Sequence, residues 1–249
     1  MIARAIDAVL ALRPKPDCMI VSGDLTDCGL PAEYAVLRKL LKPLDMPVYL
    51  VPGNHDRREN FQSAFHNYPG IPAKGHVNYV VEEFPVRIIA LDTVVPGHGQ
   101  GELTDTTLDW LEATLAHHSQ KPTLIFMHHP PFDAGAWDMD SIRLKDGSQR
   151  FHGIVARNRQ IEHVLCGHHH RSIHIRYAGT MASTGPSVAH QSALDFTPGT
   201  QGAIMMEPPA YQLHVWLEGQ GVVSHTLYVE KYDGPYPFLT PPEYPGKPG

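Results

Sequence analysis

Four short stretches of the chain carry side chains that are suited to binding metal ions. In chain order they read SGDLTD at 22–27, PGNHD at 52–56, MHHPP at 127–131 and CGHHHR at 166–171. Each stretch follows an apolar run that predicts a buried strand. Open α/β sheets bind ligands at the carboxyl ends of their strands, so the four stretches should meet at one edge of the fold. We therefore expect them to form one metal site.

These residue types suit the hydrolysis of a phosphodiester, which is anionic and very slow to react. Two metal ions about 3.5–4 Å apart can neutralise its oxygens and lower the pKa of a water molecule. Asp24 is the best candidate for a bridging carboxylate, and Asn54 offers a neutral carbonyl oxygen. Ring nitrogens come from His128, His168 and His170. The last two are two residues apart, so on an ideal strand both would face the same side.

Strands and helices alternate over the first two-thirds of the chain. The apolar runs predict strands at 18–22, 48–51, 77–81, 86–91, 123–127 and 161–166, and the helical periodicity predicts helices at 2–12, 31–42, 57–67, 103–118 and 151–159. Thr104 is a plausible N-cap of the fourth helix. From residue 172 the alternation of apolar and polar residues predicts a second, mainly antiparallel sheet. The expected fold is α/β, a four-layer α/β/β/α sandwich of two mixed sheets flanked by helices.

The composition limits the classes of protein that this chain can belong to. With 249 residues it should form one domain over 1–232, with an irregular lid at 132–150 and a proline-rich extended tail at 233–249. The formal net charge of -6 argues against binding duplex nucleic acid. No run of about 18 apolar residues and no signal peptide is seen, so no membrane partner is expected. Three cysteines without ligand spacing favour reduced thiols and a cytoplasmic location. The lid and the tail are plausible contact surfaces for a homo-oligomer.

The four stretches, in their order and approximate spacing, resemble the signature of the calcineurin-like metallophosphoesterases. The chain looks most like the bacterial class III 3′,5′-cyclic-nucleotide phosphodiesterases and the related glycerophosphodiesterases. Three further segments are similar to that subgroup, namely LDT at 91–93, TLDWL at 107–111 and STGPS at 183–187. The resemblance implies the metallo-dependent phosphatase fold and two divalent transition metal ions, which mixed oxygen and nitrogen ligation allows to be Mn, Fe, Zn or Co.

The resemblance also implies a role for each metal-binding residue. Asp24 would bridge the two ions, Asn54, His128 and His168 would complete the ligands of one ion, and His170 would serve the other. A hydroxide that bridges the metals would attack phosphorus and expel an alcohol. The implied substrate is a small diester such as the 3′,5′-cyclic nucleotide cAMP. A glycerophosphodiester or a broad range of phosphodiesters is the alternative.

Two residues of the second stretch receive catalytic roles from the same resemblance. His55 would bind the phosphate or protonate the leaving alkoxide, and Asp56 would orient it. His129 is mainly a neighbour that packs or forms hydrogen bonds, with a weaker alternative role in binding substrate. For Asp27, a capping or turn role and a role in the site are equally open. In the lid, Trp137 either closes the lid or stacks on a base.

The chain departs from the family pattern at its first motif. The family begins with a strand that carries Asp-x-His, whereas this chain begins with a helical stripe in which Asp7 is followed two residues later by Val9. One of the two metal sites is then incomplete, with only Asp24 and His170. We expect that about 15–25 residues, including the first strand, are missing through a mis-assigned start. The alternative is a degenerate scaffold that binds one metal or a partner and catalyses little.

Overall fold

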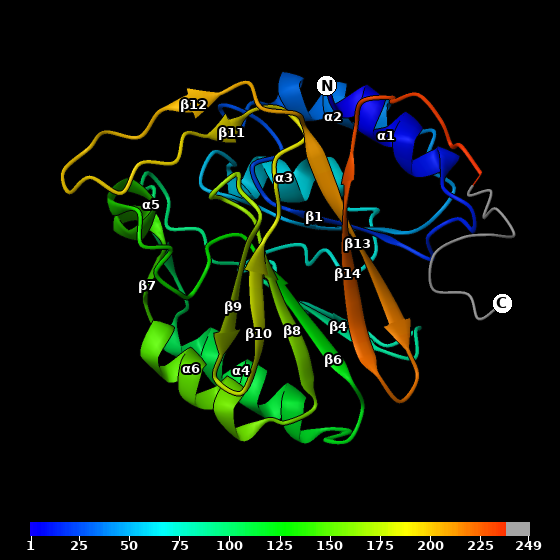
Figure 1. The fold of residues 1–249 in the computed structure, drawn as a ribbon. Coiled ribbons are helices and arrows are strands. Elements are labelled where there is room, and N and C mark those ends of the chain that lie inside the picture. Colours follow the sequence, from blue (N-terminus) through cyan, green and yellow to red (C-terminus); the bar gives the residue numbers. More distant parts are fainter. Residues whose placement is uncertain (238–249) are drawn as a thin grey trace, which may run out of the picture.

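A six-stranded mixed sheet forms the centre of the molecule (Figure 1). The computed structural model describes residues 1–237, so the tail predicted over 233–249 lies outside the described residues from 238 onward. Four neighbouring strands run parallel, and an antiparallel strand closes each edge. In sheet order the strands are β3 (Tyr79–Val81), β4 (Arg87–Leu91), β6 (Thr123–Met127), β8 (Ile161–Cys166), β10 (Thr180–Thr184) and β9 (Ile173–Tyr177).

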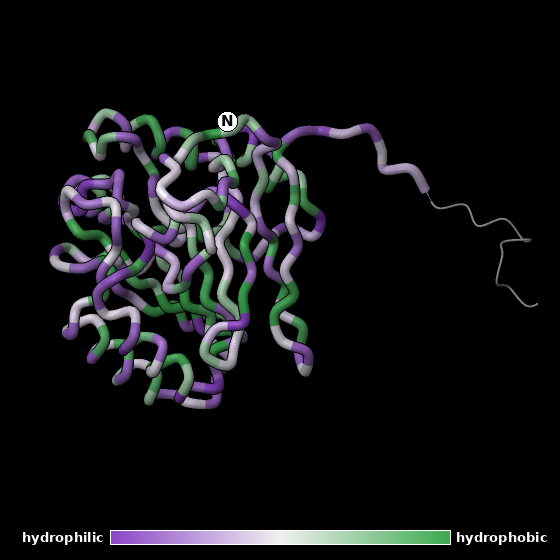
Figure 2. Tube along the Cα trace, turned by 60° about the vertical axis from the view of Figure 1, so that its left-hand side comes forward, coloured by the Kyte–Doolittle hydropathy of each residue, from purple (hydrophilic) through white to green (hydrophobic). Residues whose placement is uncertain are grey.

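Both faces of this sheet are covered, which explains why its inner strands read as continuous apolar runs. All five residues of β4 and of β6 are buried. Alternate side chains enter two separate cores: Ile88 packs in one and Ile89 in the other. This pattern is typical of parallel strands that lie between two layers. Figure 2 shows the same division, with hydrophobic strands inside and helices of alternating hydropathy outside.

Two helices, α4 (Asp105–Ala116) and α6 (Ser148–Arg157), cover one face of the large sheet (Figure 1). The hydroxyl of Thr104 accepts a hydrogen bond from the backbone N–H of Thr107 at 3.2 Å, so the predicted N-cap is confirmed. The apolar stripe of α4 is buried against the sheet through Leu108, Leu111 and Leu115.

The opposite face carries a second β layer made of two separate pairs of strands. β1 (Met19–Ser22) pairs in parallel with β2 (Val48–Val51), and β13 (Ala210–Leu217) forms an antiparallel hairpin with β14 (Gly221–Tyr228). The outermost layer consists of α1 (Ile2–Ala11), α2 (Pro31–Leu41) and α3 (Arg58–Phe65). The predicted α/β/β/α order of layers is confirmed. Within residues 1–237 the other edge of β1 has no strand partner.

Two predictions about the second half of the chain are wrong. The segment 132–150 is not irregular: it contains α5 (Trp137–Ile142), β7 (Leu144–Asp146) and the start of α6, and β7 pairs with β5 (Gly101–Glu102). These elements are too short to show a periodic pattern of apolar residues in the sequence, and contacts with residues outside the segment stabilise them. The strands β9 and β10 belong to the large sheet, whereas a second sheet was expected from 172 onward. Alternation indicates an exposed face, but it does not identify the neighbouring strand.

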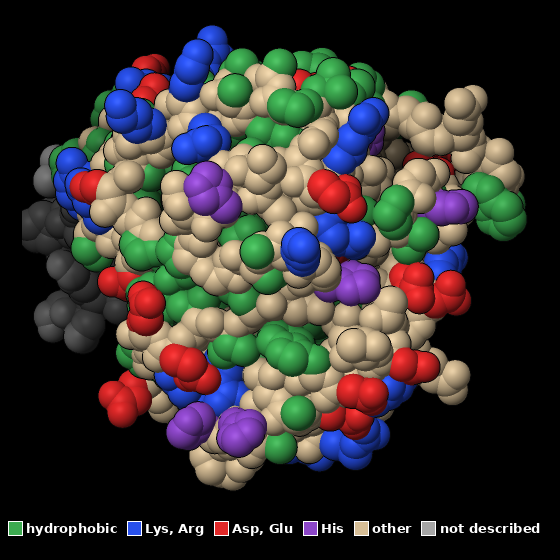
Figure 3. Space-filling model, turned by 180° about the vertical axis from the view of Figure 1, so that it is seen from behind, with side chains coloured by type: hydrophobic (Ala, Val, Ile, Leu, Met, Phe, Trp, Pro, Cys, Tyr) green, Lys and Arg blue, Asp and Glu red, His purple; other side chains and the backbone are tan. Residues whose placement is uncertain are grey.

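The chain also forms a short two-stranded arm outside the main layers. β11 (Gln191–Ser192) and β12 (Ile204–Met205) form a two-stranded hairpin that extends above α5 (Figure 1). Seen from behind, the surface mixes basic, acidic and apolar side chains, and neither charge forms an extended area of its own (Figure 3). Among residues 1–237 no helix combines the length and the apolar content needed to cross a membrane.

Candidate metal and catalytic site

Four of the predicted metal ligands converge at the carboxyl ends of four strands. The Nε2 atom of His128 lies 3.0 Å from Asn54 Oδ1, 3.1 Å from His168 Nδ1 and 3.2 Å from Asp24 Oδ2. We call these four residues the donor cluster. Asp24 follows β1, Asn54 follows β2, His128 follows β6 and His168 follows β8. The expected convergence is therefore present, and metal binding by these residues stays a prediction.

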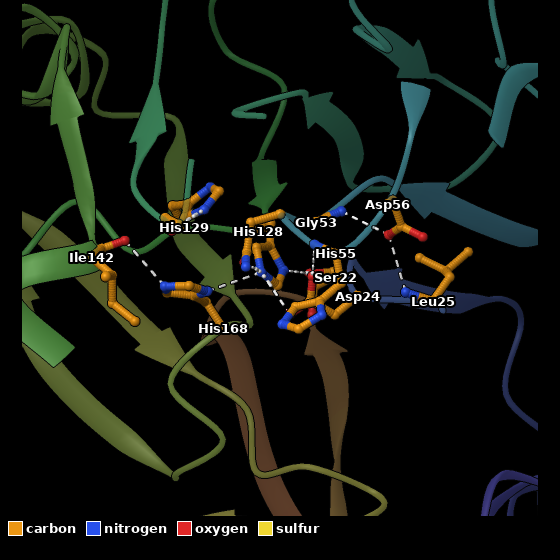
Figure 4. Close-up of polar contacts among 12 residues, drawn as sticks. Ser22, Asp24, Leu25, Gly53, His55, Asp56, His128, His129, Ile142 and His168 are labelled. Carbon is orange, nitrogen blue, oxygen red and sulfur yellow. Dashed lines mark hydrogen bonds and ion pairs between the residues drawn. The ribbon is translucent and has the colours of Figure 1, made fainter. Parts of the chain in front are cut away.

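The positions of the protons show why this cluster suits a cation. His128 Nδ1 lies 2.7 Å from the carbonyl oxygen of Ser22, and His168 Nε2 lies 3.0 Å from that of Ile142 (Figure 4). A carbonyl oxygen only accepts, so each of these nitrogens carries the proton and the other ring nitrogen carries a lone pair. Four lone pairs then face one another. A protonated His128 supplies a single N–H to this group, whereas a divalent ion attracts all four donors.

Close backbone approaches hold the cluster together. A Cβ atom on Gly23 would lie 2.4 Å from His128 Nδ1, and one on Gly53 would lie 2.2 Å from Asp24 Oδ1. Both glycines are therefore required by the geometry of their turns. Asp24 and His168 themselves adopt positive φ angles of 52° and 70°, which are unusual for residues with a side chain. Strained backbone of this kind is found where the surrounding structure fixes a functional group.

The electrostatic environment shifts the pKa of each titratable donor in a different way. Burial raises the pKa of the Asp24 carboxyl, but the contacts with His128 and the backbone N–H of His55 together lower it below its usual value. For His128, burial lowers the pKa, but the Asp24 carboxylate and the hydrogen bond to the Ser22 carbonyl together raise it above its ordinary value. The pKa of His168 lies well below its ordinary 6.5 because of burial and the neighbouring His128. Its imidazole is thus neutral at neutral pH, as a metal ligand must be.

His129 lies beside the cluster but has no nitrogen free for a metal. Nitrogen atoms of His128, His129 and His168 lie within 4.8 Å of one another. However, His129 Nε2 bonds to the carbonyl oxygen of Gly99 at 3.1 Å, and its Nδ1 bonds to the hydroxyl of Thr93 at 2.8 Å. The side chain is fully buried. The structure thus favours the predicted packing role of His129 over substrate binding.

His170 does not join the donor cluster. Residues 168 and 170 both have positive φ angles, so the segment is a tight turn, and the expectation that an extended strand would place both side chains on one side is wrong. The ring of His170 instead packs against that of His190, with centroids 4.8 Å apart. No local pattern singles out His190 among the seventeen histidines, because the contact joins segments that are separate in the sequence.

His55 stands at the open side of the cluster. Its backbone N–H donates to Asp24 Oδ1 at 3.0 Å (Figure 4). Its ring Nδ1 lies 2.9 Å from the carbonyl oxygen of Asp27. The carboxylate of Asp27 lies 3.7 Å from the same nitrogen. The side chain is half exposed, at 49%, and within residues 1–237 its Nε2 atom has no hydrogen-bond partner. This nitrogen is available to exchange a proton with a substrate.

Asp56 does not orient the ring of His55 as predicted. Its carboxylate accepts hydrogen bonds from the backbone N–H groups of Leu25 at 3.0 Å and Gly53 at 2.9 Å, and from the hydroxyl of Tyr34 at 2.8 Å. Burial raises its pKa. Asp56 therefore ties the first turn to the second, and Asp27, which the sequence left undecided, is the residue that contacts the imidazole.

Comparison with known proteins agrees with this geometry. The family model "Calcineurin-like phosphoesterase" matches residues 2–172. The chain is 40% identical to a probable glycerophosphodiester phosphodiesterase, GpdQ, of Arcobacter nitrofigilis, with 91% of this chain and 83% of that protein covered. It is 37% identical to a probable cyclic nucleotide phosphodiesterase of Rhodopseudomonas palustris, with 90% and 82% covered. Among solved structures, a dimetal phosphatase from Danio rerio has a similar fold, with a TM-score of 0.62 at 17% identity and 92% and 88% of the two chains covered.

Proposed function

The chain belongs to the calcineurin-like phosphoesterase family as a phosphoric diester hydrolase, and from that premise we propose that it hydrolyses small phosphodiesters at the donor cluster. The observation that carries the proposal is that the lone pair of His128 Nε2 faces those of three other donor atoms. A divalent ion held there would neutralise phosphate oxygens and lower the pKa of a water molecule. Asp24 and His170 are the candidates for holding a second ion.

The residues of the chain would perform the remaining steps of the reaction. The bond from His55 Nδ1 to the Asp27 carbonyl places a proton on Nδ1 and leaves Nε2 facing solvent. When this ring is protonated, Nε2–H can donate to a phosphate oxygen or to the departing alkoxide. The Asp27 carboxylate lies 3.7 Å from Nδ1 of the same ring. His55 is thus placed to act as a general acid next to the ligand Asp24.

Two substrate classes are proposed for this site. The sequence favours a 3′,5′-cyclic nucleotide, and cyclic nucleotide phosphodiesterases are among the relatives. A glycerophosphodiester is the second candidate, because the relative at 40% identity carries that activity in its name. Hydrolysis of cAMP, glycerophosphocholine and bis(p-nitrophenyl) phosphate in parallel, with added Mn²⁺, distinguishes the two classes.

A pair of variants tests the role of the site. We expect His55→Ala to lower turnover by about 10²–10⁴-fold, the usual contribution of a general acid, with the metal content unchanged. His66→Ala is the matched control, because His66 is also exposed and its Nδ1 also bonds to a carbonyl oxygen, that of Ser63 at 2.9 Å. Elemental analysis of both variants accompanies the rate measurements.

Two results would overturn the proposal. The first is equal rates of hydrolysis for His55→Ala and the wild type, which would exclude His55 as the general acid. The second is the absence of diester hydrolysis by the metal-loaded wild type. The degenerate scaffold, which binds metal without efficient catalysis, would then describe the protein better.

A further inference from the structure

The helix α5 contacts the candidate metal site through its last carbonyl groups. The Nε2 atom of His168 donates to the carbonyl oxygen of Ile142 at 3.0 Å, and the Nε2 atom of His169 donates to that of Met139 at 3.1 Å. Carbonyl groups in the last turn of a helix lack partners within the helix. Two consecutive imidazoles of the 166–171 stretch satisfy two of them, so the turn and the helix depend on each other.

This contact decides which nitrogen of His168 can bind a metal. Because the carbonyl oxygen of Ile142 fixes the proton on Nε2, the lone pair lies on Nδ1, which is the atom that faces His128 (Figure 4). If α5 moved away, the neutral ring would be free to place its proton on Nδ1 and block the donor cluster. Groups that fix the tautomer of a metal-binding histidine usually contribute 10- to 100-fold to metal affinity.

His169 supports the same interpretation. It is almost fully buried, and its Nδ1 atom has no hydrogen-bond partner among the described residues. Burying a nitrogen without a hydrogen-bond partner costs free energy, so another contact of the same ring must offset this cost. Among the described residues, the one hydrogen bond of the His169 side chain is that from Nε2 to the carbonyl oxygen of Met139, a buried residue of α5. His169 therefore fastens the turn to the helix one residue away from the predicted ligand.

The position of α5 depends in turn on Asp140. This residue lies on the helix, and its carboxylate reaches back to the turn that precedes it. One oxygen accepts from the backbone N–H of Ala134, and the other accepts from that of Gly135 at 3.1 Å. Gly135 has a φ angle of 83°, so the turn has a specific shape that these bonds hold. Asp140 makes no contact with the donor cluster itself.

We propose that Asp140 is a positioning residue of the metal site, which acts by holding α5 where the carbonyls of Ile142 and Met139 fix the protons of His168 and His169. The inference rests on the proposed metal site and deepens it. It extends the site to a helix whose side chains include no predicted ligand. It also gives the 132–150 segment a role different from that of a lid, because the segment holds His168 and His169 through backbone carbonyl groups.

The test measures Co²⁺ affinity by titration of the visible absorption spectrum. We expect Asp140→Ala to weaken binding by about 10-fold or more. Asp140→Asn should restore part of the loss, because the amide keeps one acceptor oxygen. Asp138→Asn is the matched control: Asp138 lies on the same helix, and within residues 1–237 its carboxylate accepts no hydrogen bond, so its variant should bind like the wild type. An unchanged affinity in Asp140→Ala would overturn the inference.

A second measurement reads the tautomers directly, without metal and without activity. In ¹⁵N-histidine NMR spectra of the metal-free wild type, His168 and His169 should both carry the proton on Nε2. In Asp140→Ala, or in Asp140→Asn if the alanine variant does not fold, the His168 signals should shift toward a mixture of tautomers. A wild type with the proton on Nδ1 would overturn the inference, even in a protein that hydrolyses diesters. Conversely, fixed tautomers in a protein that hydrolyses no diester would leave the inference standing while the proposed activity fails.

Discussion

Two groups of buried or half-buried histidines in this protein look alike in composition but differ in what their ring nitrogens contact. In the donor cluster, His128 and His168 each donate to a backbone carbonyl oxygen with one ring nitrogen. The other nitrogen of His128 faces Asn54 and Asp24, and that of His168 faces His128. In the second group, which we call the serine-paired histidines, His163 Nε2 lies 2.9 Å from the hydroxyl of Ser183. His214 Nδ1 lies 2.8 Å from the hydroxyl of Ser224, and the rings of His163 and His214 are 5.8 Å apart.

The difference shows that burial of a histidine does not identify a metal site. A serine hydroxyl can donate or accept, so it adapts to either tautomer of the ring, and no lone pair is forced to lack a partner. A carbonyl oxygen only accepts, so it fixes the tautomer and directs the remaining lone pair. Two such lone pairs that meet a carboxylate and an amide oxygen form a group of donors that suits a cation. The partner of the other nitrogen is therefore the diagnostic feature.

The largest expected effect separates the two groups by metal content. Asp24→Ala removes the only charged donor of the cluster, so we expect bound metal to fall to near zero and hydrolysis to fall to the level of the buffer blank. His214→Gln, in the serine-paired group, should keep the metal content and the rate of the wild type. Elemental analysis after gel filtration measures both. Full metal occupancy in Asp24→Ala would refute its role as a ligand.

A smaller effect is expected on thermal stability when the metal is removed. At a free metal concentration of 100 times Kd, binding stabilises the folded state by about 2.7 kcal/mol. For a domain of this size that corresponds to about 5–10 °C in Tm. Chelation should therefore lower the Tm of the wild type and of His214→Gln by this amount, but should change that of Asn54→Ala much less. Equal shifts in all three proteins would remove Asn54 from the cluster.

The smallest effect is a pH dependence that belongs to the serine-paired histidines. Burial lowers the pKa of His163 and of His214 to about 4, from an ordinary 6.5. As pH falls from 6.5 to 4, the unfolded chain takes up protons that the folded chain does not, so the free energy of unfolding decreases. Between pH 6.5 and 5.5 the loss is about 1 kcal/mol per histidine. Urea denaturation of metal-free protein should show a flatter decrease in His214→Gln, and an identical slope would contradict the assignment.

The inner strands of the large sheet were predictable from the sequence because they are buried on both faces. The runs at 123–127 and 161–166 match β6 and β8, since continuous apolar runs leave no ambiguity about burial. The pairing of β9 and β10 was not predictable, because it depends on contacts with β8 that no local pattern records. The short α5 and β7 were missed for the same reason. Their hydrogen-bond partners, such as Pro130 for Leu144, lie outside the segment itself.

For the site, the sequence identified residue types better than contacts. The four residues of the donor cluster were all predicted, because each follows a recognisable strand. The partner of His55 was assigned to the neighbouring Asp56, whereas the contact comes from Asp27 on another turn. The positions of His170 and His190 depend on a turn with positive φ angles, which a residue with a side chain adopts only under tertiary constraint. Such contacts are properties of the folded chain.

The tight approach of the turns after β1 and β2 limits how this protein can change. Since neither Gly23 nor Gly53 has room for one additional carbon atom, a saturation library should show both positions as intolerant, whichever amino acid is introduced. Asp27, whose backbone carbonyl contacts His55 and whose side chain is largely exposed, should accept many replacements. Selection experiments that aim at new substrates are therefore better directed at the exposed rim around His55 than at the glycines beneath it.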